Sequence, residues 1–140
     1  MEDVDDMMRE AEAARANAYA PYSRFKVGAC IRTASGNLYN GCNVENAAFP
    51  EGTCAEAGAI AAMVAAGERE IVAIAICGGP ADGPAKRCLP CGGCRQKLFE
   101  FAPPDGDLAI FPEPGDDRAV MLSTLLPQPF GPEDLAGPND

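Results

Sequence analysis

The alternation of apolar and polar positions divides the first part of the chain into a helix and a hairpin. Apolar residues recur every three or four positions over residues 4–18, which predicts an amphipathic helix that ends before Pro21. Residues 25–32 alternate between apolar and polar side chains, as a half-buried strand does. A Ser-Gly-Asn turn at residues 35–37 and a second strand over residues 38–44 complete the predicted hairpin.

The second part of the chain continues with helices and strands in alternation. A helix is expected from near Thr53 to about Ala66, and it is apolar on nearly all sides, so we expect it to be buried. Residues 71–77 form a continuous apolar run, which is typical of a central strand covered on both faces. Pro90 can serve as the first residue of a further helix. The remaining expected segments are a Gly/Pro-rich loop at 78–89, that helix over about 91–101, a short strand at 108–111, a strand or connector at 120–122, and a tail from 125.

This order of elements predicts the class of the fold. Helices that alternate with strands indicate an α/β protein, and we expect a three-layer α/β/α fold with a mixed sheet of about five strands. A length of 140 residues fits a single domain over residues 1–140. The sequence contains no apolar run of about 18 residues, so no membrane-spanning helix is expected. Residues 1–6 are acidic and lack the basic start of a secretory signal, which favours a cytoplasmic protein.

The charge and the residue types present narrow the range of functions. The formal net charge is −10 and the pI is near 4.4, which argues against a nucleic-acid partner and favours a small, weakly charged substrate. The sequence contains no histidine, which excludes Ser-His-Asp triads, Cys-His pairs and histidine metal ligands. Seven cysteines without a secretory signal indicate reduced thiols, some of them metal ligands.

Two short motifs provide candidate ligands for a catalytic metal. Cys54-Ala55-Glu56 is followed by Cys91-Gly92-Gly93-Cys94, and both begin at predicted helix starts. Three thiolates can hold Zn²⁺ and leave a fourth position open for water, while Glu56 is free to move protons. Helix starts carry unpaired N–H groups and partial positive charge, so we expect lowered thiol pKa values there. A Cys-x-Glu with a downstream Pro-Cys-x-x-Cys is also the signature of zinc nucleobase deaminases.

Each motif also has an interpretation without chemistry. Thr53 and Glu56 have the spacing of a helix capping box. Cys88 could join the other three cysteines and close a structural site of four thiolates. The occurrence of both motifs at two helix starts favours the catalytic site over these alternatives. A lone cysteine is most often a small buried apolar residue, which is the expected role of Cys30, Cys42 and Cys77.

From about Ala18 to Leu135 the chain resembles the cytidine deaminase family in its small homotetrameric form. The resemblance implies a zinc-dependent hydrolase that deaminates cytidine and deoxycytidine to uridine and deoxyuridine, with release of ammonia, in pyrimidine salvage. It also implies Zn²⁺ bound by the three cysteines and Glu56 as the proton-transferring catalytic residue. The segments that carry it are 20–29, 41–47, 54–56, 90–96 and 125–135.

The resemblance further implies roles for residues outside the two motifs. Asn43 and Glu45 would bind the ribose hydroxyls, the main chain of Ala55 would contact the base, and Phe25 would pack near it. Phe130 would reach the pocket of a neighbouring subunit, so that a homotetramer shares its active sites. Without the family resemblance, Asn43 and Glu45 are consistent with a solvated turn after a strand. Phe25 would then be an ordinary core residue, and Phe130 would anchor the tail.

One position departs from the pattern of the tetrameric relatives. They commonly carry Arg immediately after the catalytic Glu, whereas this chain has Ala57. Zinc with three thiolates has a net negative charge, and we expect the two helix starts and Arg95 to offset it. Blasticidin-type deaminases also lack that Arg, but they lack the Asn-Val-Glu-Asn segment found here. The alternatives are a deaminase of another aminopyrimidine nucleoside, a non-catalytic zinc protein, and a nucleic-acid editing deaminase, which the acidic charge disfavours.

Overall fold

A mixed five-stranded sheet forms the middle layer of the computed structural model, which describes residues 2–104 and 107–135. The expected domain of residues 1–140 also includes Met1, 105–106 and 136–140, which lie outside the described residues. The strand order is β2-β1-β3-β4-β5, and only β3 and β4 run parallel among these neighbours. The strands are β1 (Phe25–Thr33), β2 (Leu38–Cys42), β3 (Ile71–Pro80), β4 (Ala109–Phe111) and β5 (Val120–Met121).

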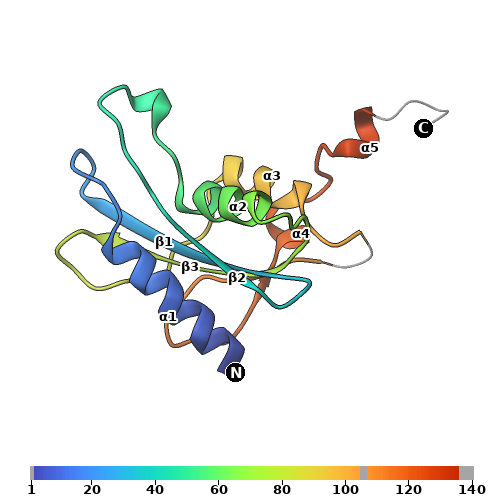
Figure 1. Ribbon diagram of the computed structural model, residues 1–140, viewed down its shortest axis with the longest axis horizontal. Coiled ribbons are helices and arrows are strands. Elements are labelled where there is room, and N and C mark those ends of the chain that lie inside the picture. Colours follow the sequence, from blue (N-terminus) through green and yellow to red (C-terminus); the bar gives the residue numbers. More distant parts are fainter. Residues whose placement is uncertain (1, 105–106, 136–140) are drawn as a thin grey trace.

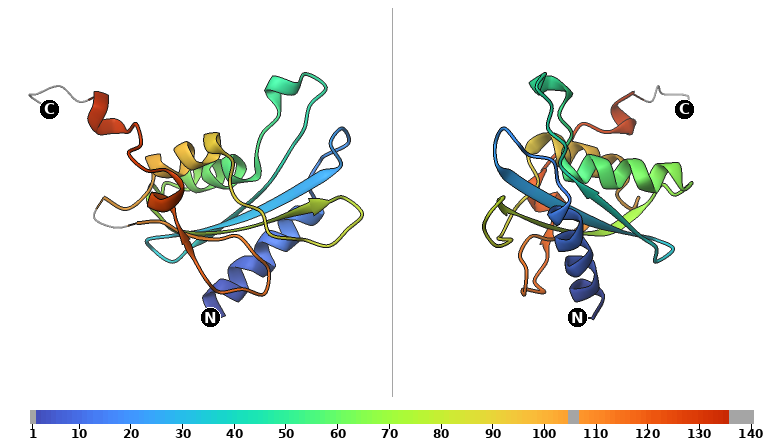
Figure 2. Two further views of the ribbon diagram at one scale, coloured as in Figure 1. Left: turned by 180° about the vertical axis from the view of Figure 1, so that it is seen from behind. Right: turned by 60° about the vertical axis from the view of Figure 1, so that its left-hand side comes forward.

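Helices cover both faces of the sheet, as Figure 1 shows. Helix α1 (Glu2–Ala16) packs on one face, and α2 (Ala55–Ala65) and α3 (Gly92–Glu100) pack on the other. The expected three-layer α/β/α fold is thereby confirmed. Short helices α4 (Leu122–Leu125) and α5 (Pro132–Leu135) follow β5, and α5 projects away from the layers (Figure 2). No helix among the described residues is long and apolar enough to cross a membrane.

Alternate residues of the central strands supply the two apolar layers. Ile31, Ile74 and Ile76 lie in the cluster beneath α2 and α3, and all three are fully buried. Cys30 and Ala75 point the other way, into the cluster beneath α1. Successive side chains of a strand face opposite sides of a sheet, so an apolar run such as 71–77 must be covered twice. The structure confirms this expectation for β3.

Two glycines allow helices to lie directly against the sheet. A Cβ on Gly28 would lie 1.9 Å from the carbonyl oxygen of Ala11 in α1. A Cβ on Gly41 would lie 2.2 Å from the carbonyl oxygen of Ala55 and 2.4 Å from the backbone nitrogen of Ala59. The backbone of α2 therefore contacts β2 with no side chain between them. This contact fixes the first turn of α2, and with it Cys54, relative to the sheet.

Several element boundaries differ from the sequence expectations. The helix predicted from near Thr53 begins at Ala55, and Pro90 lies before α3 because Cys91 is its N-cap. Strand β3 runs to Pro80 through part of the predicted loop, because its last residues pair with β1. A 3-10 turn at Phe49–Glu51 was not predicted.

The prediction that the helix over residues 53–66 is buried is correct for only one side of α2. Its inner side is buried, but Ala61 is exposed and Val64 is only partly covered. A helix that is apolar on nearly all sides is therefore not necessarily buried on all sides within a single chain.

Candidate active site

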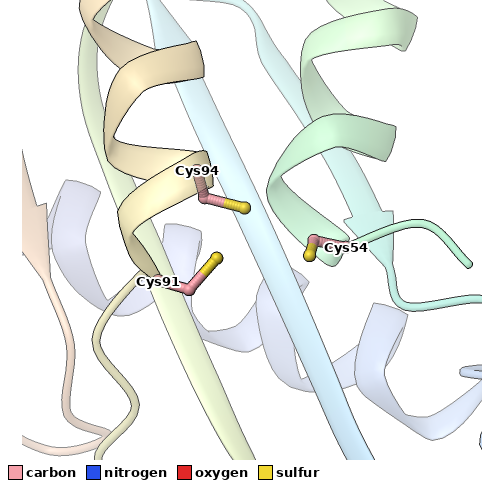
Figure 3. A group of neighbouring side chains, drawn as sticks. All are labelled: Cys54, Cys91 and Cys94. Atoms are coloured by element: carbon pink, nitrogen blue, oxygen red, sulfur yellow. The ribbon is translucent and has the colours of Figure 1, made fainter. Parts of the chain in front are cut away.

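Three thiols converge at the adjacent starts of α2 and α3. Cys54 is the N-cap of α2, Cys91 is the N-cap of α3, and Cys94 lies in the first turn of α3. Their sulfur atoms all lie within 4.8 Å of one another and face a common space (Figure 3). Zn–S bonds of about 2.3 Å place the sulfurs of a tetrahedral site about 3.8 Å apart. The donor set therefore fits a zinc ion held by three thiolates.

Backbone hydrogen bonds and burial act in opposite directions on these thiols. The backbone N–H of Cys94 lowers the pKa of the Cys91 thiol, as the sequence analysis predicts for a helix start. For Cys54 that prediction is wrong, because burial raises the pKa of its thiol. Burial also raises the pKa of Cys94. A bound cation outweighs the effect of burial on these pKa values, since a thiol that coordinates a metal ion is deprotonated.

Glu56 is a buried carboxyl group beside the three thiols. Its side chain is only 4% exposed, and burial raises its pKa, while a hydrogen bond to its own backbone and one with the Cys94 thiol lower it. The capping-box alternative fails, because the N-cap of α2 is Cys54 and no side chain caps the helix. Thr53 instead pairs through its backbone with Val44. A buried carboxyl with a perturbed pKa in a cavity is a candidate for proton transfer.

A cavity of about 320 Å³ joins the thiols to the Asn-Val-Glu-Asn segment. Its lining includes Asn43, Glu45, Ala55 and Glu56 together with the three candidate ligands. A larger hollow of about 540 Å³ lies elsewhere, between the end of α3 and the C-terminal tail. The smaller cavity therefore brings together residues from the segment after β2 and from the starts of α2 and α3 that the sequence analysis assigned to one site.

Cys88 lines the same cavity but does not join the three-thiol group. Its thiol lies 3.8 Å from the carbonyl oxygen of Leu89, and burial raises its pKa to about 11. A Cβ on Gly78 would lie 3.0 Å from the Cys88 sulfur and 3.1 Å from the Phe25 ring, so both side chains flank Gly78. This placement argues against the structural site of four thiolates. The lining position Leu89 carries no sequence signal that separates it from the rest of its loop.

Backbone groups hold the two candidate sugar-binding side chains in place. Asn43 accepts from the N–H of Val27 (2.8 Å) and donates through Nδ2 to the carbonyl oxygen of Phe25 (2.9 Å). Glu45 accepts from the N–H groups of Tyr22 (3.0 Å) and Ser23 (3.1 Å) and from the Ser23 hydroxyl. The Ser23 hydrogen bonds lower the pKa of Glu45, which therefore stays charged at neutral pH.

The other candidate residues lie outside the lining of this cavity. Phe25 is 43% exposed, and Phe130 is 59% exposed near the C-terminal tail. Arg95 donates through Nε to the carbonyl oxygen of Pro90 (2.8 Å) and through Nη1 to that of Leu125 (3.1 Å). These bonds tie the start of α3 to α4, and the charge-offsetting role of Arg95 stays a prediction.

Comparison with known proteins places the chain in a family. Residues 1–106 match the family model described as the cytidine and deoxycytidylate deaminase zinc-binding region. The chain belongs to this deaminase family. The match confirms the family expected from the sequence. The family model describes a zinc-binding region, and the three-thiol group can supply the ligands for that zinc.

Relatives of similar length support the assignment to the family. A cytidine deaminase of Halalkalibacterium halodurans is 40% identical over 130 residues, which cover 92% of this chain and 95% of the relative. One of Mycobacterium tuberculosis is 39% identical over 137 residues, or 96% of each chain. The crystal structure of the Burkholderia pseudomallei cytidine deaminase has a TM-score of 0.76 at 40% identity, covering 89% of this chain and 97% of that one. The Mycobacterium tuberculosis structure has a TM-score of 0.77 at 36% identity, covering 90% and 95%.

Proposed function

We propose that this protein is a zinc-dependent enzyme that hydrolyses cytidine and deoxycytidine to uridine and deoxyuridine, with release of ammonia, in pyrimidine salvage. The observation that carries the proposal is the meeting of three thiols and one buried carboxyl, Glu56, at a single cavity. Family membership identifies the class of reaction, and the names of the relatives indicate cytidine as the substrate.

The cysteines and Glu56 have different roles in the proposed reaction. Cys54, Cys91 and Cys94 hold the zinc, and when bound it acts as a Lewis acid that lowers the pKa of a water molecule. Glu56 takes a proton from the water that attacks C4 of the cytosine ring, and it delivers that proton to ring N3. It then takes the second proton from the hydroxyl now on C4 and passes it to the amine, so that the C4–N bond breaks as the C4 carbonyl forms and ammonia leaves. Because Glu56 is not a ligand, its carboxylate is free for both transfers.

The Asn-Val-Glu-Asn segment supplies the groups that orient the nucleoside. Glu45 presents a charged carboxylate, and its hydrogen bonds to residues 22 and 23 hold it rigidly at the rim of the cavity. A charged acceptor suits ribose hydroxyl donors. Asn43 lies beside it, and we assign it to the same sugar. The main chain of Ala55 contacts the base, and Phe25 packs near it from β1.

We also propose that one domain forms each subunit of a homotetramer with shared active sites. The outer side of α2 and the facing side of α3 form an open groove with an apolar lining that includes Ile60, Ala61 and Phe101. Large apolar side chains are also exposed near the cavity and in the tail, among them Phe49 and Phe130. Contact between copies would cover these surfaces, and Phe130 would then enter the site of a neighbour.

Loss of the cytosine chromophore tests the proposed reaction directly. The purified protein is incubated with cytidine, deoxycytidine and a panel of other aminopyrimidine and purine nucleosides, with and without a zinc chelator. We expect turnover of the two cytosine nucleosides, loss of activity with the chelator, and recovery when Zn²⁺ is returned. Rejection of cytidine with turnover of another nucleoside would establish the alternative deaminase. Zinc binding without turnover of any nucleoside would establish the non-catalytic zinc protein.

A further inference from the structure

A lysine of α3 reaches back toward the thiol group. Lys97 lies three residues after Cys94 and four after Gly93, so these positions share one side of the helix. Helical side chains lean toward the N-terminus of their helix, which directs the Lys97 stem toward the start of α3. A Cβ on Gly93 would lie 3.8 Å from the Lys97 nitrogen and 4.0 Å from the Cys91 sulfur. The missing side chain at Gly93 thus leaves one small space bordered by both atoms.

The charges around this space are otherwise negative. Zinc with three thiolates keeps a net negative charge, and Glu56 adds a buried carboxyl. Burial raises the pKa of Glu56, and the positive charge of Lys97 opposes that rise. Arg95, the other cation near the start of α3, directs its guanidinium to two backbone carbonyl oxygens. None of the ion pairs between described residues includes Lys97, whose ammonium is therefore available to the thiols.

The neighbouring helix leaves room for this cation. Lys97 and Ala57 both line the groove between α2 and α3, which has a volume of about 530 Å³. Ala57 follows Glu56 directly in α2, and its short side chain provides no charge on that wall. Among the described residues, the one cation that lines this groove therefore comes from α3.

We propose that the ammonium of Lys97 offsets the negative charge of the metal-binding thiolates and thereby strengthens zinc binding. The inference rests on the proposed function, because it requires the three thiols to hold zinc. Lys97 acts through the thiolates and touches no substrate. Its side chain is exposed in the single chain, and it lines the groove that the proposed contact between copies would cover.

The test compares zinc affinities by competition with a chromophoric chelator. Lys97→Met removes the charge but keeps an unbranched stem, and we expect its zinc dissociation constant to rise about tenfold. Lys97→Arg should retain nearly wild-type affinity. An arginine on the opposite wall, in the double variant Ala57→Arg with Lys97→Met, should recover part of the loss. The matched control is Lys86→Met, which removes an exposed lysine from the loop before Cys88 and should leave the affinity unchanged.

The outcomes separate this inference from the proposed function. If the wild type binds zinc and deaminates cytidine while Lys97→Met binds zinc within twofold of it, only the role of Lys97 is wrong. An equal loss in Lys86→Met would also overturn that role. If the wild type takes up no zinc, the proposed function and this inference both fail. Thermal unfolding of each variant checks that the fold is intact.

Discussion

Replacing Gly41 by alanine should disturb both the stability and the metal site. The new Cβ would lie 2.2 Å from the carbonyl oxygen of Ala55 and 2.4 Å from the nitrogen of Ala59, whereas real Cβ atoms essentially never come within 3.0 Å of such atoms. Both contacts are with backbone, so no side chain can rotate away, and α2 itself must move off β2. Overpacking a core costs about 1–3 kcal/mol. We expect Gly41→Ala to lower the free energy of unfolding by about 3 kcal/mol, at the upper end of that range.

The same displacement should weaken zinc binding. Cys54 directly precedes Ala55, so a shift of the first turn of α2 moves its sulfur relative to Cys91 and Cys94 on α3. The assay is urea unfolding at matched protein and zinc concentrations, because ligands and assembly both change apparent stability. Zinc content after passage through a desalting column gives the second readout. Gly41→Ala should lose metal that the wild type retains.

Gly58 provides the matched control, because it faces Gly41 from inside α2. A Cβ there would lie 3.6 Å from the Gly41 Cα, an ordinary contact. Alanine is favoured over glycine inside a helix by about 0.8–1 kcal/mol, so Gly58→Ala should keep its zinc and become slightly more stable. The reasoning is refuted if Gly41→Ala unfolds at the wild-type urea concentration and retains its zinc.

Three further substitutions test separate parts of the structure. Hydrogen bonds from Ser35, Tyr39 and Asn37 hold the pKa of Glu68 at about 2. The stability that the charged Glu68 contributes is therefore lost as the pH falls from the usual carboxyl pKa toward 2. Over that pH range the melting temperature of Glu68→Gln should fall less steeply than that of the wild type. Arg95→Ala should lower stability by about 1–3 kcal/mol by removing two charged hydrogen bonds, and full zinc content with full turnover would contradict its charge-offsetting role. Glu45→Gln should raise KM for cytidine more than it lowers kcat, and an unchanged KM would remove Glu45 from the sugar site.

The layered fold was predictable because its signals are local and repeated. The unbroken apolar run of β3 indicates a strand covered on both faces, and the structure covers both faces as expected. The alternation in β1 predicts a half-buried strand, and this prediction is wrong, because Cys30 packs beneath α1 while Ala29 and Ile31 pack beneath α2 and α3. Boundaries were less predictable where pairing partners decide them. Strand β3 continues through Gly78 and Gly79 because β1 offers backbone partners there, and glycine gives no strand signal of its own.

The candidate site was predictable from residue types and spacing, and its details depended on packing. The two motifs indicate three thiols and a carboxyl, and the structure brings them together. Spacing could not show that Cys88 stays apart from the group, or that burial raises the pKa of Cys54, because both follow from contacts between distant segments. The sequence analysis did not identify Lys97 as part of the site, although helical spacing places it on the same side of α3 as Gly93. Whether an exposed lysine approaches a thiol depends on the space that Gly93 leaves, and spacing alone does not show that space.

The most direct test of the proposed mechanism is the turnover of Glu56→Gln with cytidine, measured beside its zinc content. The amide keeps the size of the side chain but cannot accept or deliver the proton. We predict about one zinc per chain and a folded protein, with kcat lower by about 10²–10⁴-fold. A variant that holds zinc and still turns over cytidine within tenfold of the wild-type rate would contradict the role of Glu56 and the mechanism built on it.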